Sequence, residues 1–189
     1  MGEERISRLR VPEEAELPGD IQELYAQNRA KPGFVPNVFQ ALALRPSALR
    51  GFIALYDSLM TEESGLSKAE REMIVVAVSA VNHCHYCLVS HGAVLRIRAK
   101  DAALADTVAA NYRAAALTPR QLAMLDYAVK VTRASAEVGD EDLEALRAHG
   151  FGDEDIFVIT QIAAFFNYSN RMASALGIRP NGEFYGMGR

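Results

Sequence analysis

Two thiols and a base lie close together in one short segment of the sequence. Cys84 and Cys87 are the two cysteines of the chain, at C-x-x-C spacing, and His91 follows four residues after the second thiol. The thiolate is the reactive form of cysteine, so a base that removes the thiol proton makes cysteine a nucleophile toward peroxides and disulfides. Two thiols at this spacing can also close a small disulfide ring. The segment is therefore a candidate redox site.

A carboxylate upstream of the thiols can complete this set of groups. Glu72 comes twelve positions before Cys84, in a preceding helix that must fold back on the next one. If the chain is helical from about Cys84 onward, both thiols and His91 share one helix face, because they stand at positions i, i+3 and i+7. Glu72 is then expected to hydrogen-bond His91, or a bridging water, and to support the imidazolium.

This geometry assigns the attack on peroxide to Cys87, because it is the thiol with a base one helical turn away. Its thiolate would take the terminal oxygen of a hydroperoxide and become a sulfenic acid. Cys84 would lie at the helix start, where unpaired backbone N–H groups favour a thiolate, and would condense with Cys87 to a disulfide. An external dithiol reductant would then restore both thiols. The predicted substrate is an organic hydroperoxide or hydrogen peroxide.

Two other interpretations of the cysteine pair are a structural role and a metal site. Free cysteines are often small buried hydrophobic residues. Zinc could use both thiols, His91 and either His83 or His85 as ligands. However, Cys84 and His91 would lie about 10 Å apart along a helix axis, and zinc bonds of about 2.0–2.3 Å do not easily gather such ligands. We therefore expect neither a metal nor a cofactor.

Bulk properties narrow the class of protein. The 189 residues fit one domain, and a formal net charge of −4, without a Lys/Arg cluster on a predicted helix, argues against nucleic acid and anionic membranes as partners. The N-terminal residues are charged and lack the apolar stretch of a signal peptide. The longest uncharged run, about residues 156–170, is too short and too polar to span a bilayer. We expect a cytoplasmic protein, where a lone C-x-x-C is more often catalytic or metal-binding than structural.

Helices are predicted nearly throughout the chain. Residues 1–17 are expected to form an irregular lead-in, and residues 18–189 a single domain. Capping boxes at Ser67 and Thr118 start two helices, since a Glu or Gln follows each by three positions. Further helices are expected from about residue 20 to 30, from Pro46, from Asp140 to Gly150 and from Asp153 to Gly177. No segment shows strand alternation, so the predicted class is all-α, a compact helical bundle.

An internal repeat is a further interpretation. When Asp155 is aligned with Glu72, Asn167 falls on Cys84 and Asn170 on Cys87. This match suggests two related helical hairpins, of which the first kept its thiols. Alternatively, any two buried helices match to this degree.

Several aromatic side chains could line an apolar channel for an organic hydroperoxide. They are Phe34, Phe39, Phe52, Tyr56, Phe165 and Phe166. Such residues more often belong to the core, which we favour for most of them.

The thiol segment resembles the alkylhydroperoxidase D-like proteins of the carboxymuconolactone decarboxylase superfamily. The shared pattern is Glu-x11-Cys-x-x-Cys-x-x-x-His, which is matched by Glu72, Cys84, Cys87 and His91. Similarity to the peroxidase-related branch extends to residues 35–39, 66–72, 82–87 and 170–173. The resemblance thus covers most of the chain from about residue 32 to residue 177.

The resemblance implies an all-α fold and peroxidase activity supported by a dithiol partner, either a protein or a lipoyl group. Carried over by motif position, Cys87 would form the sulfenic acid and Cys84 would be its partner and proton donor. Glu72 and His91 would form the proton relay. The superfamily's decarboxylases lack the cysteine pair, so that reaction is not expected here.

One position departs from the family pattern. The family has a histidine directly before the second cysteine, whereas this chain has Tyr86 there and His85 one position earlier. The relay that the resemblance implies is therefore changed at this point, with His85 and Tyr86 as candidate supporting residues.

Assembly is the last expectation from the sequence. The resemblance implies homo-oligomers built from trimers, either a trimer or a hexamer. Residues 156–166 carry apolar side chains on more than one face, which favours burial of part of that surface by another subunit. We expect the thiol site near a subunit boundary.

Three functions remain in view at this point. The leading one is an antioxidant thiol peroxidase. A second is a dithiol–disulfide oxidoreductase that passes electrons between proteins or lipoyl groups. The third is a redox-sensing interaction module, in which disulfide formation alters a partner-binding surface.

Overall fold

The computed structural model describes residues 5–189, and within this range it contains helices and no strands. The α-helices are α1 (Gly19–Ala30), α2 (Asn37–Leu42), α3 (Pro46–Thr61), α4 (Lys68–Val81), α5 (His85–Ala99), α6 (Ala102–Asn111), α7 (Pro119–Ala134), α8 (Asp140–Ala148) and α9 (Asp153–Leu176). Short 3-10 helices cover Glu14–Glu16, Tyr112–Ala114, Ser135–Glu137 and Gly182–Tyr185. The predicted all-α class is confirmed.

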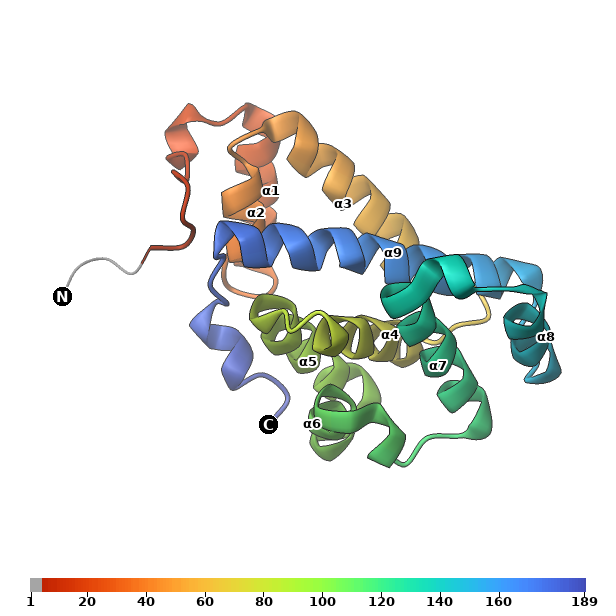
Figure 1. Cartoon of the computed structure of the whole chain (residues 1–189). Helices are drawn as coiled ribbons and strands as arrows, with labels where there is room; N and C mark the ends of the chain where they lie inside the picture. The colour runs from red at the N-terminus through yellow and green to blue at the C-terminus, as the bar shows by residue number, and fades with distance from the viewer. Residues whose placement is uncertain (1–4) are drawn as a thin grey trace.

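The long helix α9 organises the bundle. It crosses the middle of the molecule, with α1, α2 and α3 on one side and α4, α5 and α6 on the other (Figure 1). It packs against α3, α4, α5 and α7, and α5 folds back along α4. The hairpin of α4 and α5 therefore lies between α9 and the outer helix α6, and most of α4 is buried. No helix among the described residues is long and apolar enough to cross a membrane.

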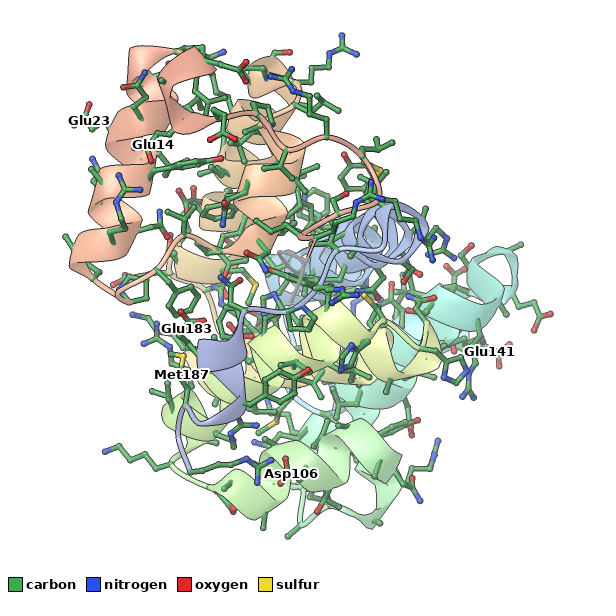
Figure 2. All side chains as sticks on the ribbon, turned by 90° about the vertical axis from the view of Figure 1, so that its left-hand side faces the viewer. Glu14, Glu23, Asp106, Glu141, Glu183 and Met187 are labelled. Atoms are coloured by element: carbon green, nitrogen blue, oxygen red, sulfur yellow. The ribbon has the colours of Figure 1, made fainter. Side chains whose placement is uncertain are left out.

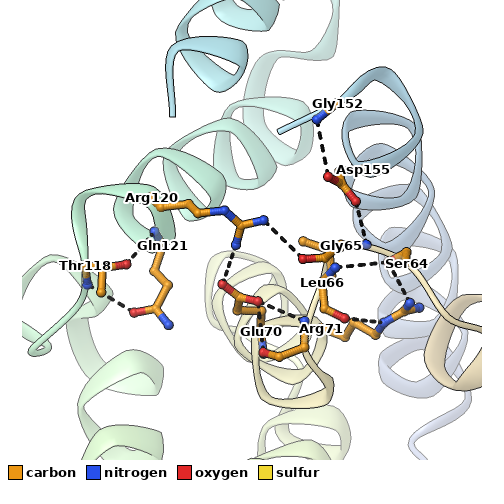
Figure 3. Close-up of polar contacts among 11 residues, drawn as sticks. Ser64, Gly65, Leu66, Glu70, Arg71, Thr118, Arg120, Gln121, Gly152 and Asp155 are labelled. Atoms are coloured by element: carbon orange, nitrogen blue, oxygen red, sulfur yellow. Dashed lines mark hydrogen bonds and ion pairs between the residues drawn. The ribbon is translucent and has the colours of Figure 1, made fainter. Parts of the chain in front are cut away.

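A polar network fixes the start of α4. Ser67 and Glu70 form the predicted capping box, in which each side chain accepts from the other residue's backbone N–H. Glu70 also pairs with Arg120 at 2.7 Å, and Arg71 donates to the Ser64 hydroxyl at 2.8 Å (Figure 3). Asp155 on α9 accepts a hydrogen bond from the backbone N–H of Gly65, in the loop that precedes α4. These contacts set the position of the helix turn that carries Glu72.

The predicted irregular lead-in is described from residue 5 onward, and residues 1–4 lie outside the described range. One 3-10 turn at Glu14–Glu16 interrupts it. The backbone N–H of Arg8 donates to Leu176 O at 2.8 Å, and Leu17 is buried in the core. The lead-in therefore packs against the end of α9. The division of the chain at residue 17 stays a prediction.

The suggested second hairpin of an internal repeat is not seen. α9 runs unbroken from Asp153 to Leu176, so Asn167 and Asn170 lie within one helix. The first segment reverses direction at residues 82–84, where the chain adopts a left-handed conformation that α9 does not have before Gly177. The two segments thus match in sequence, but only the first forms a helical hairpin.

Candidate functional site

The turn between α4 and α5 places the first thiol. His83 has a left-handed backbone conformation with φ of 51°. Its N–H donates to Ala80 O at 3.1 Å, and the N–H of Cys84 donates to Ser79 O at 3.0 Å, which are the paired bonds of a Schellman motif. Cys84 is also the N-cap residue of α5. One reversal ends the first helix and sets Cys84 at the start of the second, as the sequence predicts.

The two thiols lie together and are buried, with exposed fractions of 0 % for Cys84 and 1 % for Cys87. A hydrogen bond from the Cys87 thiol lowers the pKa of Cys84 to about 6, and the Cys87 backbone N–H and Ser174 hydroxyl act in the same direction against the effect of burial. The same hydrogen bond, together with burial, raises the pKa of Cys87 well above its usual value. Of the two thiols, Cys84 is therefore the more acidic and Cys87 holds its proton more tightly.

This coupling gives a prediction for the Cys87→Ala variant. Because the largest cause of the lowered pKa is the Cys87 thiol, its removal should move the pKa of Cys84 upward toward the ordinary cysteine value of about 8.5. The rate of alkylation by iodoacetamide rises with the thiolate fraction, so the midpoint of the rate-against-pH curve should move from near 6 to higher pH. Ser174→Ala is the control, with a smaller shift in the same direction. A midpoint that stays near 6 in Cys87→Ala would contradict the coupling.

The predicted carboxylate–imidazole pair is present. Glu72 on α4 and His91 on α5 are joined between Oε2 and Nδ1 at 2.8 Å, and both side chains are largely buried. The edge of the Phe166 ring packs against the imidazole, with ring centroids 4.7 Å apart. When Nδ1–H donates to the carboxylate, Nε2 is left to accept or donate a proton. This pair has the geometry of an imidazole base that is oriented by a carboxylate.

An apolar cavity of about 370 Å³ connects Cys87 with His91. Both residues line it, together with four of the six aromatic residues considered for a channel, Phe34, Phe39, Phe52 and Tyr56, although most of the six were expected to belong to the core. Phe165 and Phe166 are not among the described lining residues and pack in the core instead. The contacts of residues 5–189 include no direct hydrogen bond between Cys87 and His91. Proton transfer between them therefore needs a water or the substrate in this cavity.

A second cavity of about 630 Å³ borders the other thiol, and we call it the polar cavity because its lining is more polar than that of the first. Its lining includes Cys84, the exposed imidazole of His85 and the hydroxyl-bearing Tyr185. The Tyr185 hydroxyl and His85 Nε2 are 3.2 Å apart. Tyr86 lines both cavities, and its hydroxyl accepts a hydrogen bond from the backbone N–H of Val38 at 3.2 Å. Of the two candidate supporting residues, His85 thus belongs to the polar side and Tyr86 stands between the two cavities.

Sequence reasoning missed polar groups of α9 that surround the thiols. The Ser169 hydroxyl lies 4.0 Å from the Cys87 sulfur, within hydrogen-bond range for sulfur. Asn82 donates to Asn167 and Asn170 at 3.0 and 2.9 Å, and Asn170 donates to the Ser79 hydroxyl at 3.0 Å. The signals for these residues were the alignment of Asn167 and Asn170 with the two cysteines and the family similarity at residues 170–173, and neither assigned them to the site. These α9 residues lie near the thiols because α9 packs against α4 and α5.

The structure places the residues that were considered as zinc ligands. Residues 5–189 contain no group of three or more His, Cys, Asp or Glu side chains placed to hold a metal ion. His83 and His85, the histidines closest to Cys84 in sequence, are exposed, whereas both thiols are buried.

Comparison with known proteins identifies the family. The model of the carboxymuconolactone decarboxylase family matches residues 46–130, the segment that holds Glu72, both thiols and His91. A search of curated proteins finds no match.

Solved structures extend this similarity to nearly the whole chain. A peroxidase-related protein with an alkylhydroperoxidase AhpD core, from Ralstonia eutropha, is 56 % identical over 98 % of each chain, with a TM-score of 0.96. A peroxidase-related protein from Silicibacter sp. is 46 % identical over 100 % of this chain and 99 % of its own, with a TM-score of 0.95. A protein from Agrobacterium tumefaciens, whose name refers to antioxidant defence, is 26 % identical over 73 % of this chain and 93 % of its own, with a TM-score of 0.63. The chain belongs to the carboxymuconolactone decarboxylase family, in the alkylhydroperoxidase D-like group of peroxidase-related enzymes.

Proposed function

We propose that this protein is a thiol-dependent peroxidase that reduces organic hydroperoxides through a Cys84–Cys87 dithiol/disulfide cycle, with an antioxidant role. One observation carries the proposal: Cys87 and His91 line the same apolar cavity, and His91 is paired with the buried Glu72. A hydroperoxide with an apolar group fits this lining better than hydrogen peroxide, which needs polar partners.

The first step of the cycle takes place on Cys87. Its thiolate attacks the terminal oxygen of the hydroperoxide, the O–O bond breaks, and the alkoxide leaves as an alcohol after it gains a proton. Cys87 becomes a sulfenic acid. The Cys84 thiolate then attacks this sulfur, and the hydroxyl group leaves as water when a second proton is added. One hydroperoxide and two thiols thus give one alcohol, one water and one disulfide.

Proton movement is the part of this step that the site must supply. Cys87 holds a proton in the resting pair and must lose it before attack. Two acceptors are available: the Cys84 sulfur, which already shares this proton, and His91 Nε2 on the same cavity. Glu72 stabilises the imidazolium in the second case. The imidazolium can then protonate the departing alkoxide.

Steady-state turnover tests this function directly. The protein, supplied with dithiothreitol, should consume cumene hydroperoxide faster than hydrogen peroxide at equal concentration, because the cavity at Cys87 is mainly apolar. Residual peroxide is measured against a protein-free control. Consumption at the protein-free rate with both peroxides would contradict the proposal.

A dithiol–disulfide oxidoreductase is the second candidate. The observation that favours it is the low pKa of Cys84, the thiol beside the polar cavity, because a thiolate on that side can attack an external disulfide. Reduction of insulin disulfides separates the two functions. Fast insulin reduction without peroxide turnover would favour this candidate.

We also propose that the chain assembles into a trimer or a hexamer. Phe157, Ala164 and Tyr168 lie on one face of α9, at positions i, i+7 and i+11, and the two aromatic side chains have exposed fractions of 62 % and 48 %. Large apolar groups on one exposed face are typical of a protein–protein interface. This stripe supports an interface on α9.

The α9 stripe gives a prediction about mass in solution. Light scattering coupled to size exclusion should give a multiple of the 20.7 kDa chain mass for the wild type. The double variant Phe157→Glu, Tyr168→Glu should shift it to the monomer, because it places charges at an apolar contact. Leu44→Glu, a similarly exposed position outside the stripe, is the matched control and should keep the wild-type mass. A wild-type monomer at micromolar concentration would contradict the assembly.

A further inference from the structure

We propose that the two half-reactions use opposite sides of the dithiol: the hydroperoxide reaches Cys87 through the apolar cavity, and a small dithiol reductant reaches the disulfide at Cys84 through the polar cavity. This inference rests on the proposed peroxidase function, because it assigns the access route of the reductant. Its experiment is designed so that the two proposals can fail separately.

Each of the two thiols lines a different cavity. Among the described residues, the polar cavity is lined by Cys84 and not Cys87, and the apolar cavity by Cys87 and not Cys84. Consecutive residues of the C-terminal segment face the two sides. Phe184 lines the apolar cavity and meets the Phe34 ring edge-on at 5.0 Å, whereas Tyr185 lines the polar cavity. The segment therefore separates two access routes to one pair of sulfur atoms.

Fixed contacts hold this separating segment in place. The buried Arg96 on α5 donates through Nε to Met187 O at 2.8 Å and through Nη2 to Phe184 O at 2.9 Å. Arg189 pairs with Asp106 on α6 at 3.0 Å. Figure 2 shows the segment, with Glu183 and Met187 labelled, running beside the α4–α5 hairpin toward Asp106. Because an arginine of the hairpin itself binds the segment, both cavities keep their separation.

The chemistry of the polar cavity fits a thiolate reductant. His83, His85, Ser174, Tyr185 and the guanidinium-bearing Arg179 are among its lining residues, and none of the described lining residues is Asp or Glu. A dithiol attacks as a thiolate anion, which such a lining does not repel. The volume of about 630 Å³ admits a small dithiol, whereas the apolar cavity offers a polar reductant few partners.

Reduction of the Cys84–Cys87 disulfide takes two successive thiol–disulfide exchanges. The reductant thiolate attacks the Cys84 sulfur, the Cys84–Cys87 bond breaks, and Cys87 leaves as a thiolate on the side of His91, where it gains a proton. The second thiol of the reductant, as a thiolate, then attacks the reductant sulfur that is bonded to Cys84. This bond breaks, and Cys84 is released as a thiolate. The reductant ends as a disulfide and the protein as a dithiol. Cys84 is the more acidic thiol and so the better leaving group, which alone would favour attack on the Cys87 sulfur. Attack on the Cys84 sulfur therefore requires that the reductant reach only that sulfur.

Two obstructing variants test the access routes independently. Gly182 lines the polar cavity, and a Cβ added there meets no atom within 4 Å and requires no left-handed backbone. Gly182→Trp is designed to fill the polar cavity. Ile53 is a partly buried residue that lines the apolar cavity, and Ile53→Trp is designed to fill that cavity. Gly186→Trp is the matched control, because Gly186 lies on the same segment with equally open space and is not among the residues lining either cavity.

The reductive half-reaction is measured without peroxide. Each variant is oxidised to the Cys84–Cys87 disulfide with diamide and mixed with dithiothreitol, and thiols are trapped with a maleimide and counted by mass. Gly182→Trp should slow reduction about tenfold or more, because disulfide exchange depends on access to the attacked sulfur. Ile53→Trp and Gly186→Trp should be reduced at the wild-type rate. In the oxidative half-reaction with cumene hydroperoxide, Ile53→Trp alone should be slow.

Two outcomes would overturn the inference. One is a wild-type reduction rate in Gly182→Trp. The other is slow reduction in Ile53→Trp, because the reductant would then use the apolar cavity. Since diamide makes the disulfide, a protein that never reacts with peroxide can still confirm the reductive access route, and that result would reject the peroxidase function alone. The chain has no tryptophan of its own, so the fluorescence of each introduced one reports whether the variant is folded.

Discussion

Cys87→Ser abolishes the rapid reaction with hydroperoxide, whereas Cys84→Ser leaves a sulfenic acid on Cys87 that a trapping reagent captures. The expected loss in Cys87→Ser is roughly a thousandfold or more, because removal of a nucleophile leaves only the binding contributions of the site. In Cys84→Ser the oxygen is still transferred, but no second thiol is present to expel it as water. Mass spectrometry after peroxide treatment with the trap measures both outcomes.

The two serine variants are each other's controls, since they replace neighbouring buried thiols by the same group. Cys84 has the lower pKa of the two thiols, whereas the apolar cavity and His91 lie beside Cys87. The trapping experiment therefore shows whether the lower pKa or the access to the apolar cavity determines which cysteine reacts with the hydroperoxide. A sulfenic acid trapped on Cys84 in the Cys87→Ser variant, at the wild-type rate, would reverse the assignment.

Loss of the Glu72–His91 pair should be the second large effect. His91→Gln and Glu72→Gln should each lower the rate of peroxide reduction by about a hundredfold or more, because general acid–base groups contribute on this scale. In its protonated form, His91 also helps to lower the pKa of Cys84. Both variants should therefore move the midpoint of the iodoacetamide alkylation profile to higher pH. Stopped-flow peroxide kinetics and the alkylation profile measure these effects.

Glu70→Gln is the matched control for this prediction. Glu70 lies on the same helix, but its carboxylate caps α4 and pairs with Arg120, away from the thiols. This variant should lower thermal stability and leave the alkylation midpoint unchanged. An unchanged midpoint in both His91→Gln and Glu72→Gln would mean that the Cys87 thiol and the helix terminus alone activate the pair.

Local signals in the sequence predicted much of the fold. The capping boxes at Ser67 and Thr118 start helices in the structure as predicted. Cys84 lies at the start of a helix, which was the condition for the shared face of the two thiols and His91. The contact between Glu72 and His91 was also predicted, because two helices joined by a short reversal must bring such positions together. Each of these features depends on residues close in sequence or on one helix pair.

Features that depend on distant packing could not be predicted. The Cys87 thiol is the first cause of the lowered pKa of Cys84, but burial and Ser174 of α9, which is far from the thiols in sequence, also change this pKa. The segregation of the two cavities depends on the C-terminal segment, which is held by Arg96. Tyr86 replaces the family histidine with a hydroxyl that binds the Val38 backbone N–H, a contact set by the position of α2. No local pattern encodes these contacts.

A single turnover of the wild-type protein tests the central claim most directly. The fully reduced protein is mixed with one equivalent of cumene hydroperoxide without any reductant, and the alcohol and the remaining thiols are counted. The account predicts one alcohol for each pair of thiols lost, with a peptide map that joins Cys84 to Cys87. Unchanged thiols with intact hydroperoxide, or alcohol formed without loss of these two thiols, would contradict it.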